Sequence, residues 1–178
     1  MVYNTTGADY AEYLPRLDPE EEIDAGDIVG VFGGKVTKQT RGAHQVMVIS
    51  SALAVLGNMP QGEDHALHEK IAFIGQAAVN VHGPVQPGDY IIPSDQGDGF
   101  GIAIPPPSIT PEHIGQTIGR AWDTSSAEES GKVLVAVGLS TRQAEQNLVS
   151  ELQRENRELS ERVSKLEFLV IHITTDRY

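Results

Sequence analysis

Cysteine is absent from this sequence, and its absence excludes disulfides, thiolate catalysis and thiolate metal sites. Basic residues are also few: 13 Lys and Arg stand against 25 Asp and Glu, which gives a net charge of -12. A chain with so little positive charge is a poor partner for nucleic acid or an anionic membrane. No apolar run has the length of a membrane span, and the N-terminus MVYNTTGADY lacks the basic and apolar parts of a signal peptide.

The motifs of common enzymes and cofactor sites are missing as well. There is no glycine-rich phosphate loop followed by Lys, no nucleophile elbow and no zinc-binding helix motif, so we predict no cofactor and no metal. His65, His68 and Glu69 form a cluster, but a metal site would need a further ligand, and we prefer an exposed polar turn. Aromatic residues make up only 6% of the chain, and we expect Trp122 in the core.

What the sequence does contain divides it into three regions. Its 178 residues, 39% of them hydrophobic, are enough for one domain with a core and an extension. We read residues 1–24 as an N-terminal leader that holds a DYAE motif and a solvated acidic run. Residues 25–140 are read as a β domain, and residues 141–178 as a C-terminal helix.

The middle region consists of short β-branched segments separated by turn signals such as GG, GP and PGD. Two turns place Gly-Asp just before a strand, at Gly26-Asp27 and Gly88-Asp89. There Gly accepts a positive φ, and Asp can bond the next backbone N–H. We therefore predict a mainly β fold: a compact barrel- or sandwich-like domain of short strands, followed by a C-terminal coiled-coil helix. The predicted strand segments are DIVGVF, KVTKQT, QVMVISS, KIAFIGQAAVNV, DYIIPS, GFGIAI, TIGRAW and KVLVAVGL.

The last region contains a heptad repeat and predicts a parallel homo-oligomer. A strict seven-residue apolar repeat favours a coiled coil over a lone amphipathic helix. Val at a, Leu at d and the polar Asn156 at a favour two strands and fix the register, whereas apolar g positions leave room for a third helix. Two or three copies both remain open on these residues. The predicted interface comprises Val149, Asn156, Val163 and Val170 at a, and Leu152, Leu159, Leu166 and Ile173 at d.

Two carboxylates near the N-terminus, Asp9 and Glu12, are the candidate catalytic residues. Nearby carboxylates in a partly buried site split their pKa values, so that one serves as acid and the other as base. The bond before Asp9 is flanked by Gly7 and Ala8, and either carboxylate could direct a water at the Ala8 carbonyl. A structural role explains the same residues, with Asp9 capping a turn and Glu12 paired with an arginine. Physics alone favours that structural role.

The motifs GADYAE, GD-IVGV, VLGN, GQ-VNV-GPV-PGDYI-PS and GRAW together resemble the C-terminal intramolecular-chaperone domain of phage appendage and tail-spike proteins, over residues 4–140. The resemblance implies a homotrimer whose partner is the upstream fibre segment of the same polypeptide. It implies that the domain aids fibre folding and then cuts itself off at Ala8–Asp9, with Asp9 and Glu12 as the catalytic carboxylates. It also implies a location in the host cytoplasm during phage assembly, or on a virion or cell-surface fibre.

Two other functions fit the same sequence. One is a non-catalytic trimerisation or capping module of a phage or bacterial surface fibre, which would leave an N-terminally extended chain uncut. The other is a barrel that binds a sugar or a peptide and is carried on a coiled coil. That second function needs a groove lined with aromatic residues, and this chain has few to supply.

Overall fold

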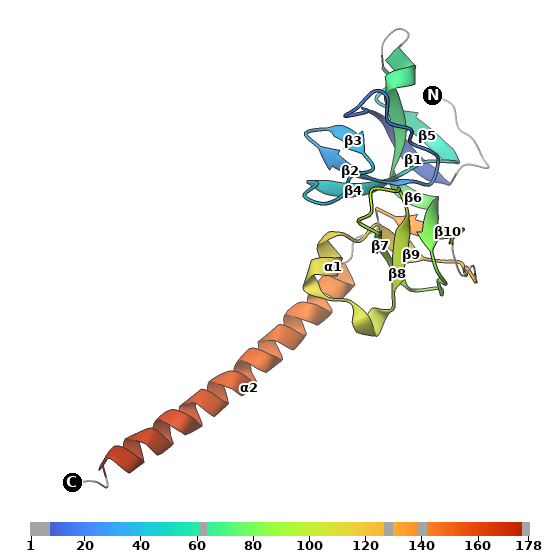
Figure 1. Cartoon of the computed structure of the whole chain (residues 1–178). Coiled ribbons are helices and arrows are strands. Elements are labelled where there is room, and N and C mark those ends of the chain that lie inside the picture. The colour runs from blue at the N-terminus through green and yellow to red at the C-terminus, as the bar shows by residue number, and fades with distance from the viewer. Residues whose placement is uncertain (1–7, 61–63, 127–129, 139–141, 176–178) are drawn as a thin grey trace. The chain divides into compact units, whose positions relative to one another are not determined.

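A computed structural model describes residues 8–60, 64–126, 130–138 and 142–175, and in the C-terminal helix it describes side chains at 149, 150 and 152–166. The chain has two compact units, Met1–Ser140 and Thr141–Tyr178. The first unit holds the described strands and a short α-helix, and the second holds one long helix (Figure 1).

The strands of the described residues form one ten-stranded, largely antiparallel sheet. Most of the predicted segments are strands, and β1 and β5 are additions to them. A short helix, α1 (Pro111–Gly115), precedes β9. The strands are β1 (Asp9–Pro15), β2 (Ile28–Phe32), β3 (Lys35–Thr37), β4 (Gln45–Ile49), β5 (Leu53–Gly57), β6 (His68–His82), β7 (Tyr90–Pro93), β8 (Gly101–Ile104), β9 (Gly119–Ala121) and β10 (Ser130–Val137), with 3-10 turns η1 (Asp64–Leu67) and η2 (Pro106–Ser108).

Five of these strands close into a barrel. Their order is β10-β9-β7-β8-β6, and the pairing of β10 with β6 completes the ring. Strand β6 is 15 residues long, and β10 follows it antiparallel from Ser130 opposite His82 to Val137 opposite Gly75. The prediction of a mainly β fold with a barrel is therefore confirmed.

The other end of β6 belongs to a second group of strands. In Figure 1, β6 runs from the group that contains β1 to β5 into the barrel strands. There it pairs with β4 and, antiparallel, with β1, whose other edge pairs parallel with β5. Residues 9–15, which we predicted to belong to a leader, thus form a strand inside the sheet.

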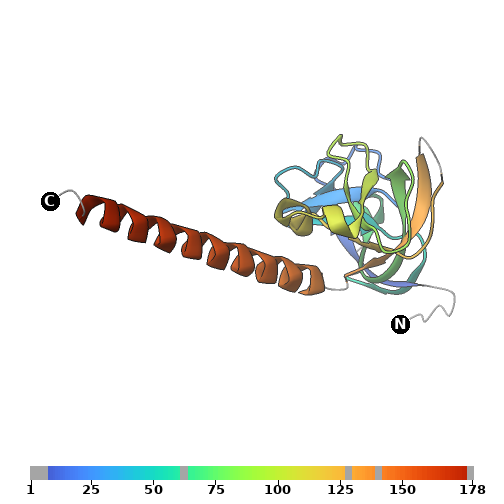
Figure 2. The same cartoon turned by 90° about the horizontal axis from the view of Figure 1, so that it is seen from below.

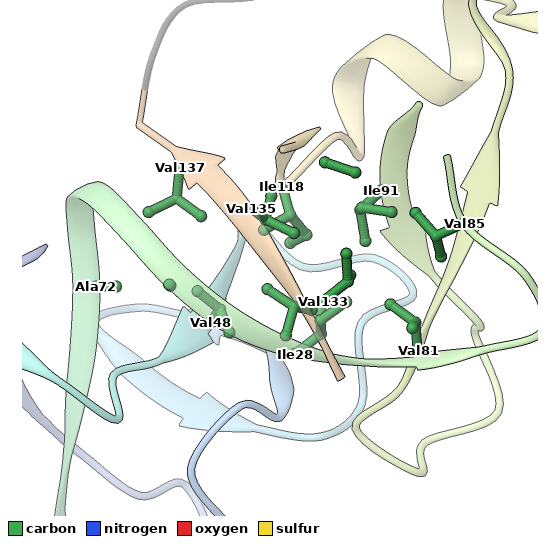
Figure 3. Packing of buried hydrophobic residues seen from close by; sticks show 13 residues of the cluster. Ile28, Val48, Ala72, Val81, Val85, Ile91, Ile118, Val133, Val135 and Val137 are labelled. Atoms are coloured by element: carbon green, nitrogen blue, oxygen red, sulfur yellow. The ribbon is translucent and has the colours of Figure 1, made fainter. Parts of the chain in front are cut away.

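Val and Ile side chains fill the barrel. Along β10 every second residue points inward, as a half-buried strand requires, and Val133 and Val135 lie among Ile28, Ile91 and Ile118 (Figure 3). Each such side chain, fully buried, stabilises the fold by about 1.5–3 kcal/mol. A second cluster comes from β2, β3, β4, the start of β6 and the segment before β2, and it consists of Ile23, Val29, Val31, Val36, Met47, Ile49 and Ile71.

The two Gly-Asp turns have the same geometry. Gly26 has φ +96° and Gly88 has φ +93°, so the predicted positive φ is confirmed at both. Asp27 and Asp89 each accept the backbone N–H three residues earlier, at 2.9 and 2.8 Å. The prediction that Asp bonds the next N–H is wrong, because the carboxylate closes the turn backwards and fixes the chain before the strand begins.

Trp122 is 53% exposed, so the prediction that it lies in the core is wrong. It directly follows β9, in which Gly119 and Ala121 are buried and Arg120 is exposed. Alternation along the chain carries Trp122 to the same outer side as Arg120.

The second unit is the helix α2 (Arg142–Thr175), which is unbroken over 34 residues (Figure 2). The predicted C-terminal helix is therefore confirmed, while its association into a coiled coil remains a prediction. Neither helix of the described residues offers an apolar stretch long enough to cross a membrane.

Candidate active site

Strand β1 presents its residues alternately to two faces. Asp9, Ala11 and Tyr13 are buried, and Tyr10 and Glu12 between them are half-buried on the other face. The strand is hydrogen-bonded to β5 on one edge and to β6 on the other, so it cannot turn about its own axis. The two predicted catalytic carboxylates therefore lie on opposite faces of one strand, and the structure does not bring them together as a pair.

Asp9 is the more deeply placed of the two. Its side chain is 2% exposed, and both of its carboxyl oxygens lie 2.8 Å from the hydroxyl of Ser50. Ser50 follows β4, and its N–H donates to the carbonyl of Lys70 in β6. Burial raises the pKa of Asp9, and the bond from Ser50 opposes that rise without cancelling it. Asp9 thus keeps its proton to a higher pH than an exposed aspartate does.

The peptide bond between Ala8 and Asp9 is fixed on both sides. The N–H of Ala8 donates to the carbonyl of Ala52 at 2.7 Å, and the N–H of Gln76 donates to the carbonyl of Ala8 at 2.9 Å. Gly75 allows this close approach, because a Cβ there would lie 2.3 Å from the Ala8 oxygen. Ala8 itself is exposed, so the bond lies where the buried strand meets solvent.

Glu12 is held on the other face of β1. The Tyr10 hydroxyl donates a short hydrogen bond to its carboxylate, and this bond, the largest of the causes, raises the pKa of Tyr10. The pair lies over Gly57 of β5, where a Cβ would come within 2.8 Å of the Tyr10 hydroxyl. Glu12 is therefore hydrogen-bonded to Tyr10, and not paired with an arginine as the structural role assumed.

A groove of about 520 Å³ opens beside Ser50. Its lining includes Tyr13, Ser50 and a polar set: Arg16, His65, His68, Glu69 and Lys70. This groove brings solvent next to the hydroxyl that holds Asp9.

The histidine cluster of the sequence lies at the rim of this groove. His65 is part of the turn η1, with its ring edge-on to Tyr13 at 5.5 Å, and His68 begins β6. Glu69 is occupied by Arg16, whose guanidinium lies 2.6 Å from its carboxylate. Within the part of the chain that the structure describes, no group of three or more acidic or histidine side chains could hold a metal ion.

A second polar cluster ties the end of β6 to the loop between β7 and β8. His82 Nε2 lies 2.7 Å from Asp98, which also accepts bonds from the Ser94 hydroxyl at 2.7 Å and the Phe100 N–H at 2.9 Å. The His82 ring stacks on that of Phe100 at 4.4 Å. Burial acts to raise the pKa of Asp98, but the hydrogen bonds from His82, Ser94 and Phe100 outweigh it and lower the pKa.

The helix α2 exposes the stripe that the heptad predicts. Among its described side chains, five apolar ones are more than half exposed: Val149, Leu152, Leu159, Val163 and Leu166. Asn156 is exposed on the same helix. The side chains of Val170 and Ile173, which complete the predicted stripe, lie outside the described ones.

Ser50 and Gln76 are the residues of the site that the sequence did not indicate. Ser50 is 41 positions away from Asp9 along the chain, and Gln76 contributes only its backbone N–H. No local pattern marks either residue, because both contacts arise from the sheet.

The fold has counterparts among solved structures of a phage protein. The pre-mature bacteriophage phi29 gene product 12 matches with a TM-score of 0.52 and 16% identity, over 75% of this chain and 22% of that one. The C-terminal fragment of the same gene product matches with the same score and identity, over 72% of this chain and 99% of that fragment. At such identity the likeness establishes the fold alone. No protein-family model matches the chain, and no curated protein matches its sequence.

Proposed function

We propose that this chain is a C-terminal intramolecular chaperone of a fibre or appendage protein. It forms a parallel homotrimer, holds the upstream fibre segment of the same polypeptide in register, and cuts itself off between Ala8 and Asp9. The observation that carries the proposal is the buried carboxyl of Asp9, which immediately follows an exposed residue whose carbonyl is fixed by a backbone donor.

The fold likeness supports the proposal. This chain matches nearly all of the phi29 C-terminal fragment but only 22% of the pre-mature gene product. In that phage protein the fold is therefore a terminal part of a much longer chain, and the whole protein has a form described as pre-mature. A chaperone that is cut off after assembly fits such a terminal part of a chain. Its location is the host cytoplasm during phage assembly, or a virion or cell-surface fibre.

The exposed stripe of α2 supports the association of chains that the proposed trimer requires. The five exposed apolar side chains of α2 are in heptad register, so the association of helices would bury them. Triple-stranded β fibres depend on non-local pairing and fold slowly. A terminal coiled coil raises the effective concentration of the chains and sets their alignment. Cutting after folding then makes the assembly kinetically irreversible.

Two of the groups that the cut uses, the Asp9 carboxyl and the Gln76 N–H, are already next to the bond. A water oxygen adds to the Ala8 carbonyl carbon, and the bond to the Asp9 nitrogen breaks. The Gln76 N–H, 2.9 Å from the Ala8 oxygen, stabilises the negative charge that develops there. The Asp9 carboxyl gives a proton to the leaving nitrogen, and Glu12 takes a proton from the water. Because Glu12 lies on the other face of β1, it acts either after leaving Tyr10 or from a second copy.

The test is intact mass and light scattering on this chain with a folded tag fused ahead of Met1. Glu12→Gln is the variant, and Glu22→Gln, at an exposed glutamate, is the matched control. We expect a trimer that loses the tag at Ala8–Asp9 in the parent and the control, and keeps it in Glu12→Gln. A monomeric parent would refute the trimer.

A second function, the non-catalytic trimerisation or capping module, is favoured by one observation. Asp9 and Glu12 lie on opposite faces of β1 and make no joint site within the chain. If parent and variants stay whole while the particle is still a trimer, the capping module is the function.

A further inference from the structure

We infer that Ser50 is a positioning residue for Asp9: its hydroxyl holds the Asp9 carboxyl in the place from which it acts as an acid. The inference deepens the proposed function and rests on it for its catalytic meaning. Its physical content, the coupling of Ser50 to the titration of Asp9, can be measured whether or not the chain is cut.

The Ser50 hydroxyl contacts the whole carboxyl group of Asp9. Its oxygen lies 2.8 Å from both carboxyl oxygens, and the hydroxyl is the donor toward each of them. One hydroxyl hydrogen can be shared between the two oxygens, so the contact fixes the orientation of the carboxyl group. Asp9 is 2% and Ser50 7% exposed, so water reaches the pair only at the groove beside Ser50. The geometry therefore assigns Ser50 the role of holding the Asp9 carboxyl in one orientation.

Ser50 is itself held by the sheet. Its N–H donates to the Lys70 carbonyl at 2.7 Å, and the N–H of Ile49 beside it donates to the Asp27 carbonyl at 2.9 Å. The hydroxyl therefore starts from a backbone that β4 and β6 fix. A group placed in this way limits the rotation of the Asp9 side chain, which a mobile serine on a surface loop could not do.

The role of Ser50 in the cut follows from the proton count. When the Ala8–Asp9 bond breaks, the Asp9 carboxyl gives its proton to the leaving nitrogen and becomes a carboxylate. The Ser50 hydroxyl then donates to that carboxylate and stabilises it, because a hydrogen bond to the charged form favours that form. Without the hydroxyl, the carboxyl holds its proton more tightly and is free to turn.

The charged groups around the pair lie on two sides. Arg16, His65, His68, Glu69 and Lys70 line the groove that Ser50 shares, and Glu12 with Tyr10 occupies the opposite face of β1. Substituting Ser50 leaves all of these groups in place. A change in the titration of Asp9 therefore reports the hydroxyl.

The experiment compares the tagged parent with Ser50→Ala, Ser50→Thr, which keeps the hydroxyl, and Ser51→Ala, a control at the exposed neighbouring serine. The rate of tag loss is followed by intact mass across a pH series. The Asp9 carboxyl is titrated in the same proteins by carbon NMR, with circular dichroism to check folding.

We expect Ser50→Ala to slow the cut at least about tenfold, a part of the roughly 10²–10⁴-fold that general acid catalysis supplies. The alkaline limb of the pH profile, along which Asp9 loses the proton that it must donate, and the Asp9 titration should both move to higher pH. Ser50→Thr should restore most of the rate, and Ser51→Ala should match the parent.

An Asp9 titration and a pH profile that are identical in the parent and Ser50→Ala would overturn the inference. If the parent is not cut, the proposed cleavage fails, and the NMR titration still decides the coupling: a shift supports it and no shift overturns it. If Ser50→Ala does not fold, the Thr variant decides, since a loss of the cut in folded Ser50→Thr, with the Asp9 titration unchanged from the parent, would overturn the positioning role.

Discussion

Truncating one leucine of the α2 stripe should weaken the oligomer far more than it weakens the helix. Leu159 is 56% exposed in the single chain and occupies a d position. Full burial of a leucine side chain is worth about 1.5–3 kcal/mol, so burying the exposed part contributes about 0.8–1.7 kcal/mol per chain on association. Three copies in the proposed trimer make this about 2.5–5 kcal/mol, and any cavity left behind adds to it.

Because each 1.4 kcal/mol is about tenfold in an equilibrium constant, Leu159→Ala should weaken trimer association by about a hundredfold to a few thousandfold. Alanine has the higher helix propensity, so the helix itself is not the cause of the loss. Sedimentation equilibrium over a dilution series measures the change. Glu161→Ala, at an exposed f position of the same helix, is the matched control. If Leu159→Ala and the parent have the same mass at every concentration, the stripe is not an interface.

Three further predictions test other parts of the molecule. Asn156→Val should raise the melting temperature and loosen the choice of oligomer; an unchanged melting point would count against a buried a position. Asp98→Asn should lower the melting temperature near neutral pH, and the loss should shrink as the pH falls below 3.8 and through the lowered pKa of Asp98, because the parent then loses the carboxylate bonded to His82. A pH-independent difference in thermal melts would contradict this. Gly75→Ala should unfold at lower temperature than Gly33→Ala: both glycines have positive φ, but only at Gly75 would a methyl meet the carbonyl next to the predicted cut.

The sequence predicted the parts of the fold that local chemistry determines. Turn residues and β-branched runs located most strands, and the absence of Gly and Pro with a heptad repeat located α2. Strand β5 was not predicted, because its sequence LAVLG is as compatible with a helix as with a strand. Strand β1 was read as part of a leader, because its place in the sheet depends on partners more than 40 positions later.

The candidate site was predicted only in part for the same reason. The motif located Asp9 and Glu12, but only the pairing of β1 with its neighbours decides that they face apart. Ser50 could not be found from the sequence, since a serine after a strand is an ordinary feature and its partner lies 41 positions away.

The length of β6 bears on when the site becomes complete as the chain is made. Asp9 pairs with Gly75, and the Ser50 amide is bound to Lys70, so both halves of the site are attached to β6. Strand β6 is in turn paired along its other end with β10, which ends at Val137. Domains generally fold as units during synthesis. Within this unit, the Asp9 carboxyl is therefore made before the strands that surround it, and it reaches its final surroundings only after they have been made. The surroundings of Asp9 in β1 are therefore complete only when the chain has been made as far as β10.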